Sequence, residues 1–293
     1  MRESRVKDMP ERDADPTRRP RDKAETIVER VRRRYGEIAA RKSSCCGAGS
    51  TPLDASTSRR LARAIGYDDD QLSCSTGAAS LGLGCGAPIE LLDLQPGETV
   101  LDLGSGAGLD AILAAREVGP EGKVIGVDMT PEMLERARQN AREAGLPQIE
   151  IVEGRLEHLP VPDASIDAVT SNCVINLVPD KARVFREIAR VLRPGGRLVI
   201  SDIVLDRPLP AAIQGSVLAW VGCVAGAARR EEYLEQVKGA GLRHVEILKE
   251  LDLSSLADDF MSGEVAGFMD QIGVSIDELR GTLYSITFRA EKR

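Results

Sequence analysis

The pattern of apolar and polar positions is clearest in the middle of the chain. Thr99–Asp102 form a short apolar run with the length of a buried strand, and helical spacing begins at Leu109. Three glycines, Gly104, Gly106 and Gly108, separate these two segments. Glycine accepts positive φ angles and lets a ligand approach the backbone closely, so the sequence predicts a strand, a glycine turn and a helix in succession.

The same alternation of strands and helices extends along most of the chain. Amphipathic periodicity predicts helices over Ala24–Ala40, Ser56–Ile65, Ile89–Leu94, Glu132–Ala144, Lys181–Leu192 and Glu231–Ala240. Apolar runs predict further strands over Lys123–Val127, Ile149–Val152, Ser165–Thr170, Arg197–Ser201, Val245–Leu248 and Leu283–Ala290. This order predicts an α/β fold with a mostly parallel, twisted sheet that helices cover on both faces. For residues 251–278 the pattern indicates only an irregular helical excursion.

Four segments of different composition divide the 293-residue chain. Residues 1–22 mix both charge signs with prolines and few apolar residues, so we expect a disordered tail rather than a basic arm for nucleic acid. Residues 23–95 are expected to form a helical cap with cysteine-containing loops. Residues 96–204 form the predicted Rossmann-like, cofactor-binding core. Residues 205–293 are expected to contribute an insertion and the last strands of the sheet.

The overall composition narrows the range of partners. The net charge of −7 makes nucleic acid an unexpected partner, and no apolar run approaches the roughly 18 residues of a membrane span. The charged N-terminus lacks the apolar segment of a secretion signal, so we expect a cytoplasmic protein without membrane attachment. The sequence does not define the oligomeric state, and a monomer is the expectation. In a reducing compartment, the six cysteines are expected to be ligands or catalysts rather than structural disulfides.

The glycine turn also constrains the cofactor. Leu109 stands where a dinucleotide-binding motif requires its third glycine or an alanine, which argues against NAD or FAD. Asp128 ends the next strand, 24 residues after Gly104, and suits a carboxylate that accepts hydrogen bonds from ribose hydroxyls. The alternative is a tight turn in some other α/β protein. In the glycine turn and the two acidic residues Asp102 and Asp128, this stretch resembles the class I S-adenosylmethionine (SAM)-dependent methyltransferases. The resemblance implies their Rossmann-like fold.

One cysteine follows the predicted fourth strand directly. Cys173 lies at a carboxyl end of the parallel sheet, so it should face the same crevice as Gly104. The alternative is a buried cysteine that acts as a small apolar residue. The chain has no Cys-x-x-Cys pair, and His158 and His244 lack the spacing of zinc ligands, so a structural zinc site is not expected.

The cysteine motifs point to a narrower family. They are Cys45-Cys46-Gly47, Gly84-Cys85-Gly86, Asn172-Cys173-Val-Ile-Asn-Leu177 and Trp220-Val-Gly-Cys223-Val-Ala-Gly226. In these motifs the chain resembles the arsenite methyltransferases, over nearly its whole length from Val31 to Arg289. The cysteine pair that some members carry at the C-terminus is missing, because this chain ends at Glu-Lys-Arg293.

The resemblance implies roles for most of the cysteines. Cys85, Cys173 and Cys223 are expected to bind trivalent arsenic, the small-molecule substrate. Either Cys45 or Cys46 is expected to take part in redox turnover, with glutathione or thioredoxin as the external thiol reductant. Trivalent arsenic with three sulfur ligands keeps a lone pair, and this lone pair can attack a methyl group. No general base is therefore needed. Cys74 has no role in this scheme.

A second set of residues is expected to hold SAM. Gly104, Ser105 and Gly106 would approach its methionine part, Asp102 its amino group and Asp128 its ribose. By resemblance, the adenine is bordered by Met129 and the loop containing Gly154, Leu156 and Glu157, while Asn172 and Cys173 close the floor of the pocket. Packing in the core is the alternative for Met129.

These residues together predict SAM-dependent methylation of arsenite, supplied as a thiol conjugate, in arsenic detoxification. Two alternatives remain open. One is methylation of carbon or nitrogen on a small metabolite, with incidental cysteines. The other is a protein that captures arsenite or antimonite by its thiols without turnover, although such a protein needs no glycine turn and no Asp128.

Overall fold

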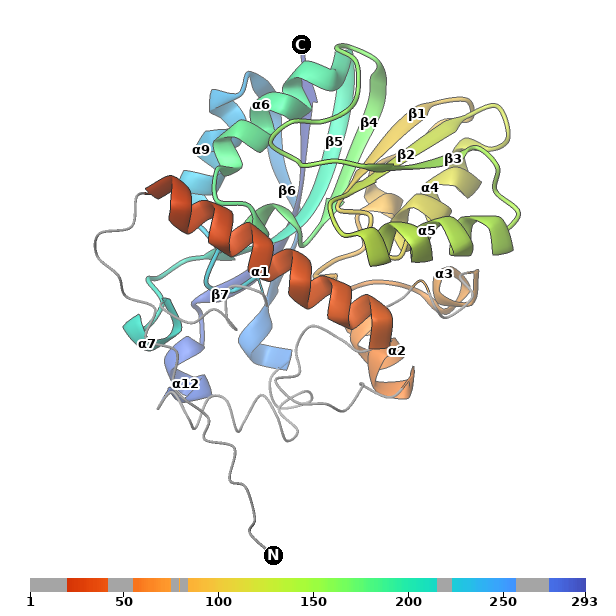
Figure 1. Ribbon diagram of the computed structural model, residues 1–293. Coiled ribbons are helices and arrows are strands. Elements are labelled where there is room, and N and C mark those ends of the chain that lie inside the picture. Colours follow the sequence, from red (N-terminus) through yellow and green to blue (C-terminus); the bar gives the residue numbers. More distant parts are fainter. Residues whose placement is uncertain (1–19, 42–54, 75–78, 80–83, 215–222, 257–273) are drawn as a thin grey trace, which may run out of the picture.

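In the computed structural model, residues 20–41, 55–74, 79, 84–214, 223–256 and 274–293 are described (Figure 1). They form one seven-stranded sheet with the strand order β3-β2-β1-β4-β5-β7-β6. Its strands are β1 (Thr99–Leu103), β2 (Lys123–Asp128), β3 (Ile149–Glu153), β4 (Ile166–Asn172), β5 (Leu192–Leu205), β6 (Leu242–Asp252) and β7 (Leu283–Lys292). The first five strands are parallel to one another, whereas β7 is antiparallel to both β5 and β6. The predicted α/β fold with a mostly parallel sheet is therefore confirmed.

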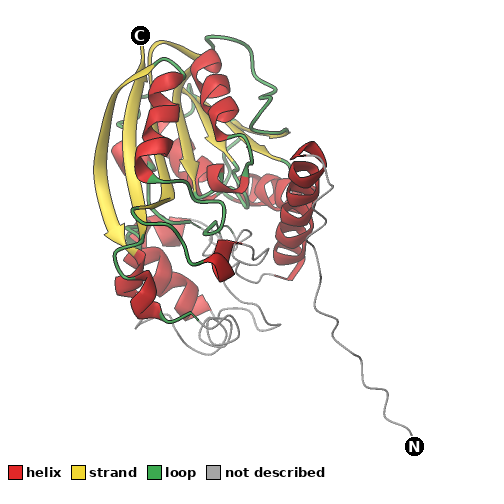
Figure 2. Ribbon diagram, turned by 90° about the vertical axis from the view of Figure 1, so that its left-hand side faces the viewer, coloured by secondary structure: helices red, strands yellow, loops and turns green. Residues whose placement is uncertain are grey.

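Helices cover both faces of this sheet (Figure 2). On one face, α6 (Lys181–Val191) and α9 (Arg230–Gly239) bury Phe185 and Tyr233 in a cluster that includes Leu101 and Val169. On the other face, α4 (Leu109–Val118) packs Ala114 and its neighbours against β1 and β2. The helix α5 (Pro131–Glu143) covers β3 on this same side. The central strands β1 and β4 are buried along almost their whole length, and their successive side chains point to opposite faces, so an apolar layer forms on each side of the sheet.

The N-terminal helices lie at the carboxyl ends of the parallel strands. The helix α1 (Pro20–Arg41) crosses this edge and packs against α5, as the red ribbon in Figure 1 shows. It is followed by α2 (Ala55–Ala64) and α3 (Asp69–Cys74). The short helices are η1 (Ile89–Leu91), η2 (Ile175–Leu177), α7 (Ala211–Gln214), η3 (Leu253–Leu256) and α12 (Ile276–Leu279). No helix in the described ranges is long and apolar enough to cross a membrane.

Several predicted boundaries are wrong by a few residues. The helix expected over Ile89–Leu94 is a single 3-10 turn, because Asp93 adopts a left-handed backbone with φ of 54° that stops it. The helix expected to reach Leu192 ends at Val191, and β5 begins there and continues to Leu205. At the N-terminus, α1 begins at Pro20, inside the predicted disordered tail of residues 1–22. Residues 1–19 lie outside the described part of the chain.

The C-terminal region is also more regular than its sequence predicts. The strand expected over Val245–Leu248 extends from Leu242 to Asp252, and β7 pairs with it along this length. Part of the stretch predicted to be irregular is therefore strand, followed by η3. Residues 257–273 lie outside the described part, so most of that expectation stays untested.

Candidate functional site

A pocket lies at the carboxyl ends of β1, β2 and β4, and α1 forms part of its wall. All eleven residues predicted from the sequence to hold the cofactor line this one pocket. They are Asp102, Gly104, Ser105, Gly106, Asp128, Met129, Gly154, Leu156, Glu157, Asn172 and Cys173. Four separate segments of the sequence meet here because parallel strands end at the same edge of the sheet. The pocket wall also includes Val28, Val31 and Tyr35 of α1, which the sequence analysis did not predict.

The glycine turn forms the part of the pocket after β1. Gly104, Gly106 and Gly108 have φ angles of 64°, 52° and 91°, a region that side chains rarely adopt. A Cβ atom on Gly104 would lie 2.4 Å from Cγ2 of Val174. The turn therefore requires glycine for its conformation, and at Gly104 also for space.

Asp128 is built into this turn by its own hydrogen bonds. Its Oδ2 accepts from the backbone N–H of Gly106 at 3.0 Å, and its Oδ1 accepts from the N–H of Thr130 at 2.8 Å. Burial raises the pKa of the carboxyl, while these backbone donors act in the opposite direction. Each carboxylate oxygen can accept a further hydrogen bond, which fits a pair of ribose hydroxyls.

Asp102 offers a second carboxylate, deeper in the pocket. Its side chain is buried, and its Oδ2 has no hydrogen-bond partner among the described atoms. Burial and the nearby Asp110 and Asp128 raise the pKa of Asp102 well above its usual range. A buried acceptor without a donor is costly, so the site fits a ligand that brings an ammonium group. Together with the glycine turn and Asp128, these residues fit SAM.

Asn172 joins the pocket to the loop that carries Cys85. Its Oδ1 accepts from the backbone N–H of Cys85 at 2.9 Å and of Gly86 at 3.3 Å. Its Nδ2 donates to the carbonyl of Gly86 at 2.7 Å, to the Tyr67 hydroxyl at 2.8 Å and to Asp110 at 3.2 Å. Tyr67 in turn donates to Asp110 at 2.7 Å. The sequence did not predict this network, because no local pattern links Tyr67 or Asp110 to Asn172, from which they are 105 and 62 residues away.

The structure brings together the three cysteines that were predicted to bind arsenic. Cys85, Cys173 and Cys223 are all buried, none forms a disulfide, and they belong to one apolar cluster. Cys173 is central, because its side chain interacts electrostatically with those of both Cys85 and Cys223. The Cys223 thiol also donates to the Cys173 carbonyl at 2.8 Å. Because Cys173 lines the cofactor pocket as well, the thiols lie directly beside that pocket.

Two of these cysteines have a strained backbone. Cys173 and Cys223 have φ angles of 60° and 64°, in the left-handed region that disfavours side chains. The backbone N–H of Cys173 donates to the Ser201 carbonyl at 2.8 Å, which fixes this conformation at the end of β4. Such strain persists where the surrounding structure imposes it, and it is typical of functional sites.

All three thiols are held in their protonated form. Burial raises the pKa of Cys85 to about 11. Interaction with the Cys223 side chain lowers the pKa of Cys173, but interaction with Cys85 and burial raise it by more. Interaction with Cys173 and burial raise the pKa of Cys223 well above its usual range. A thiophilic centre must therefore displace the thiol protons when it binds, as metal ligation generally does.

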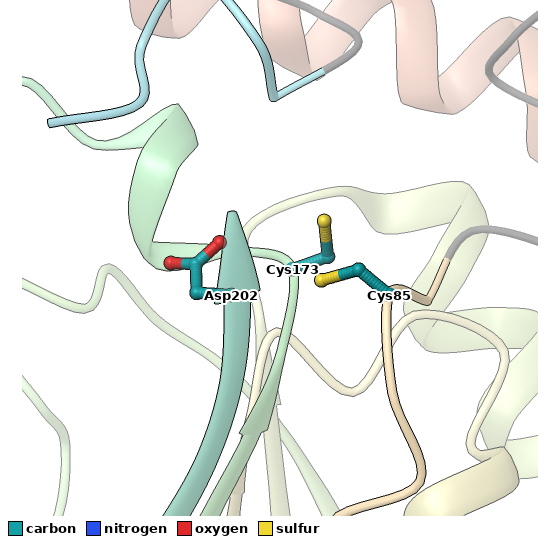
Figure 3. Close-up of side chains that lie close together, drawn as sticks. All are labelled: Cys85, Cys173 and Asp202. Atoms are coloured by element: carbon teal, nitrogen blue, oxygen red, sulfur yellow. The ribbon is translucent and has the colours of Figure 1, made fainter. Parts of the chain in front are cut away.

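A buried carboxylate beside these thiols was not predicted from the sequence. Asp202 lies in β5, and one of its oxygens approaches the Cys85 and Cys173 sulfurs within 4.8 Å (Figure 3). Burial raises the pKa of Asp202 to about 6, although hydrogen bonds from Tyr233 and Ile203 favour its charged form. It directly follows the strand predicted over Arg197–Ser201, and no motif marked it. The pairing of β4 with β5 brings it close to Cys173 at the end of β4.

The remaining cysteines are Cys45, Cys46 and Cys74. Cys45 and Cys46, and Trp220 of the fourth motif, lie outside the described residues. Cys74 is the last residue of α3. The expected redox role of Cys45 or Cys46 therefore stays a prediction.

Comparisons with known proteins agree with this geometry. A family described as a methyltransferase domain matches residues 94–249. An arsenite methyltransferase of Halobacterium salinarum is 45% identical over 251 residues, which cover 82% of this chain and 63% of that protein. One of Aquipseudomonas alcaligenes is 34% identical over 238 residues, which cover 77% of this chain and 65% of that protein. The chain thus spans less than two thirds of the length of either relative.

A solved structure supports the same assignment. The crystal structure of an arsenic(III) S-adenosylmethionine methyltransferase from Chlamydomonas reinhardtii matches with a TM-score of 0.53 and 33% identity, over 78% of this chain and 72% of that one. The chain therefore has the fold of the class I SAM-dependent methyltransferases. It belongs to the methyltransferase-domain family, and its resemblance to the arsenite methyltransferases within that class is confirmed.

Proposed function

We propose that this protein transfers methyl groups from SAM to trivalent arsenic that is held by Cys85, Cys173 and Cys223. One observation carries this proposal: three buried free thiols meet beside the pocket whose residues fit SAM, and Cys173 belongs to both. The names of the relatives favour the same substrate. A methyltransferase for carbon or nitrogen has no need of three thiols at this place.

The chemistry of arsenic fits such a site. A soft, thiophilic centre prefers thiolates over oxygen and nitrogen ligands. Three thiolates around trivalent arsenic leave a lone pair, and bound SAM supplies an electrophilic methyl group. The residues of this chain then have to hold the two reactants in one orientation and exclude water. The cysteines supply the orientation on one side, and Asp102, Asp128 and the glycine turn supply it on the other.

The further proposals concern turnover. Arsenic reaches the site as a thiol conjugate, so each cysteine thiol gives its proton to a departing thiolate as the As–S bonds exchange. Methylation makes arsenic formally pentavalent, and two cysteine thiols that form a disulfide return the two electrons. Cys85 with Cys46 or Cys45 would form this pair, and glutathione or thioredoxin would reduce it. We also propose that the protein acts as a monomer in the cytoplasm and that its role is arsenic detoxification.

A direct assay separates this function from its alternatives. Purified protein is incubated with SAM, arsenite and glutathione, and the arsenic species are separated by chromatography with elemental detection. We expect methylated arsenic to accumulate only when SAM and protein are both present. Arsenite that stays bound but unmethylated would identify a capture protein. If neither binding nor methylation of arsenic occurs, although SAM binds, a small metabolite becomes the substrate.

A further inference from the structure

A second set of donor atoms overlaps the three cysteines. Sγ of Cys85, Sγ of Cys173 and a carboxylate oxygen of Asp202 all lie within 4.8 Å of one another, and all three residues are buried. Figure 3 shows the sulfurs of Cys85 and Cys173 on one side, one above the other, and the Asp202 carboxylate on the other side. Cys223 is outside this set, and its thiol donates to the Cys173 carbonyl. The set therefore combines two sulfur donors with one oxygen donor.

Asp202 is held in place by several partners. Its Oδ1 accepts from Asn176 and from the backbone N–H of Ile203, both at 2.9 Å, and its Oδ2 accepts from the Tyr233 hydroxyl at 2.9 Å. Carboxylates that ligate metal ions are usually oriented by outer hydrogen bonds of this kind. A carboxylate has about four lone-pair positions, two on each oxygen, so these partners fill Oδ1 and leave Oδ2 able to accept one more contact.

A buried ammonium group balances the charge of this set. Lys181 is buried, and its Nζ donates to the carbonyls of Val178 at 3.1 Å and Asn176 at 3.4 Å. Asp202 and Lys181 attract each other electrostatically. Two thiolates and one carboxylate carry three negative charges. A divalent cation together with the Lys181 ammonium carries three positive charges, so the occupied site is neutral overall.

From this geometry we propose that Cys85, Cys173 and Asp202 bind a thiophilic divalent cation such as Zn²⁺. This cation competes with trivalent arsenic for the site. Zn²⁺ accepts sulfur and carboxylate ligands together, with water in the fourth tetrahedral position. On binding, the two thiols release their protons to solvent and the ion loses water. Only the competition rests on the proposed function, because the cation site itself is defined without arsenic.

The two ligands should depend on different residues. Trivalent arsenic completes its shell with three thiolates, so its binding should require Cys223 and tolerate the loss of the Asp202 charge. The cation needs the carboxylate and not the third thiol. Asp202→Asn and Cys223→Ser should therefore have opposite effects on the two ligands, which a general loss of structure cannot produce.

The experiment uses the full-length chain with Cys45, Cys46 and Cys74 replaced by Ser, so that only the three buried thiols remain. Zn²⁺ affinity is measured by titration calorimetry, and thiolate ligation by the ultraviolet charge-transfer absorption of bound Cd²⁺. Asp202→Asn should weaken Zn²⁺ binding by about tenfold or more, as loss of a ligand or its support does. Cys223→Ser should leave Zn²⁺ affinity nearly unchanged and reduce arsenite affinity. Zn²⁺ should also displace arsenite from the parent chain.

The outcomes that overturn the proposal are equally specific. Zn²⁺ affinity that is the same in Asp202→Asn and in the parent, with SAM binding intact, removes Asp202 from the site. If Asp202→Asn fails to fold, Cys85→Ser and Cys223→Ser form the matched pair. Equal Zn²⁺ affinity in those two variants then contradicts the assignment. If Zn²⁺ does not bind while arsenite is still methylated, the proposed cation site is wrong and the proposed function is unaffected.

Discussion

The side-chain oxygen of Asn172 accepts a hydrogen bond from the backbone N–H of Cys85 at 2.9 Å. Asn172 ends β4 and lines the cofactor pocket, whereas Cys85 precedes the first strand. One amide group thus fixes a predicted arsenic ligand to the floor of the pocket. The position of Cys85 therefore depends on a residue that was expected only to contact the cofactor.

Replacement of Asn172 should affect arsenic more than SAM. In Asn172→Ala, two backbone N–H groups of the Cys85 loop lose their acceptor, each at a cost of about 1–3 kcal/mol if it stays buried. We expect arsenite affinity to fall about tenfold or more and SAM affinity to change less. Calorimetric titration of both ligands measures this. Asn172→Asp keeps the acceptor and should recover part of the arsenite affinity. A larger loss for SAM than for arsenite would contradict the positioning role.

Asp128→Ala should have the opposite selectivity. The variant removes an acceptor from the ribose and frees the backbone N–H groups of Gly106 and Thr130. Hydrogen bonds to a charged group are worth roughly 1.5–3 kcal/mol each, so SAM affinity should fall tenfold or more. Asp163→Ala, which alters an exposed carboxylate, serves as the matched control. SAM affinity that equals the control would show that another group binds the ribose.

The free energy of unfolding should depend on pH through the titration of Asp202. Its pKa is raised by burial from 3.8 to about 6, so the folded state binds the proton more tightly than the unfolded state. This contribution favours folding below about pH 4 and is lost as the pH rises to about 6, by on the order of 3 kcal/mol. Relative to Asp202→Asn, the wild type should therefore lose stability between pH 4 and 6. Denaturant unfolding of both proteins measures it, and a constant difference would contradict the raised pKa.

The three buried cysteines should act as one ligand set. Each of Cys85→Ser, Cys173→Ser and Cys223→Ser replaces a soft donor by a hard hydroxyl, so arsenite should bind more weakly in each. Cys74→Ser is the matched control and should bind arsenite normally. X-ray absorption at the arsenic edge should find three sulfur neighbours in the parent and fewer in each buried variant. Oxygen neighbours in the parent complex would contradict the set.

The redox proposal has its own test. Replacing both Cys45 and Cys46 by Ser should leave arsenite binding intact but stop multiple turnover, because both proposed redox partners of Cys85 are removed. Protein quenched during turnover is digested and analysed by mass spectrometry. A peptide that joins Cys85 to Cys46 or Cys45 is expected. Its absence would instead favour a role of these two residues in delivering arsenic to the site.

The parts of the site that could be predicted are those encoded locally and those that the resemblance to a known family implied, such as the three cysteines. The glycine turn and Asp128 follow from spacing within one strand-turn-helix-strand unit, and all predicted cofactor residues line one pocket. The partners of Asn172 and the approach of Asp202 to the thiols depend on pairings over long separations, such as the 105 residues between Tyr67 and Asn172. No local pattern reports such contacts. The wall formed by α1 was missed for the same reason. The amphipathic pattern of this helix predicts that one face is buried, but not which part of the protein that face contacts.

The most direct test of the account is a single turnover on loaded protein. The chain is saturated with arsenite, freed of excess ligand and mixed with SAM that carries an isotopically labelled methyl group. We predict that one label appears on arsenic for each occupied site, that it stays absent in Cys173→Ser, and that SAM is still bound by that variant. Label that remains on SAM while arsenic is bound, or label transferred equally by Cys173→Ser, would contradict methylation at the three-thiol site.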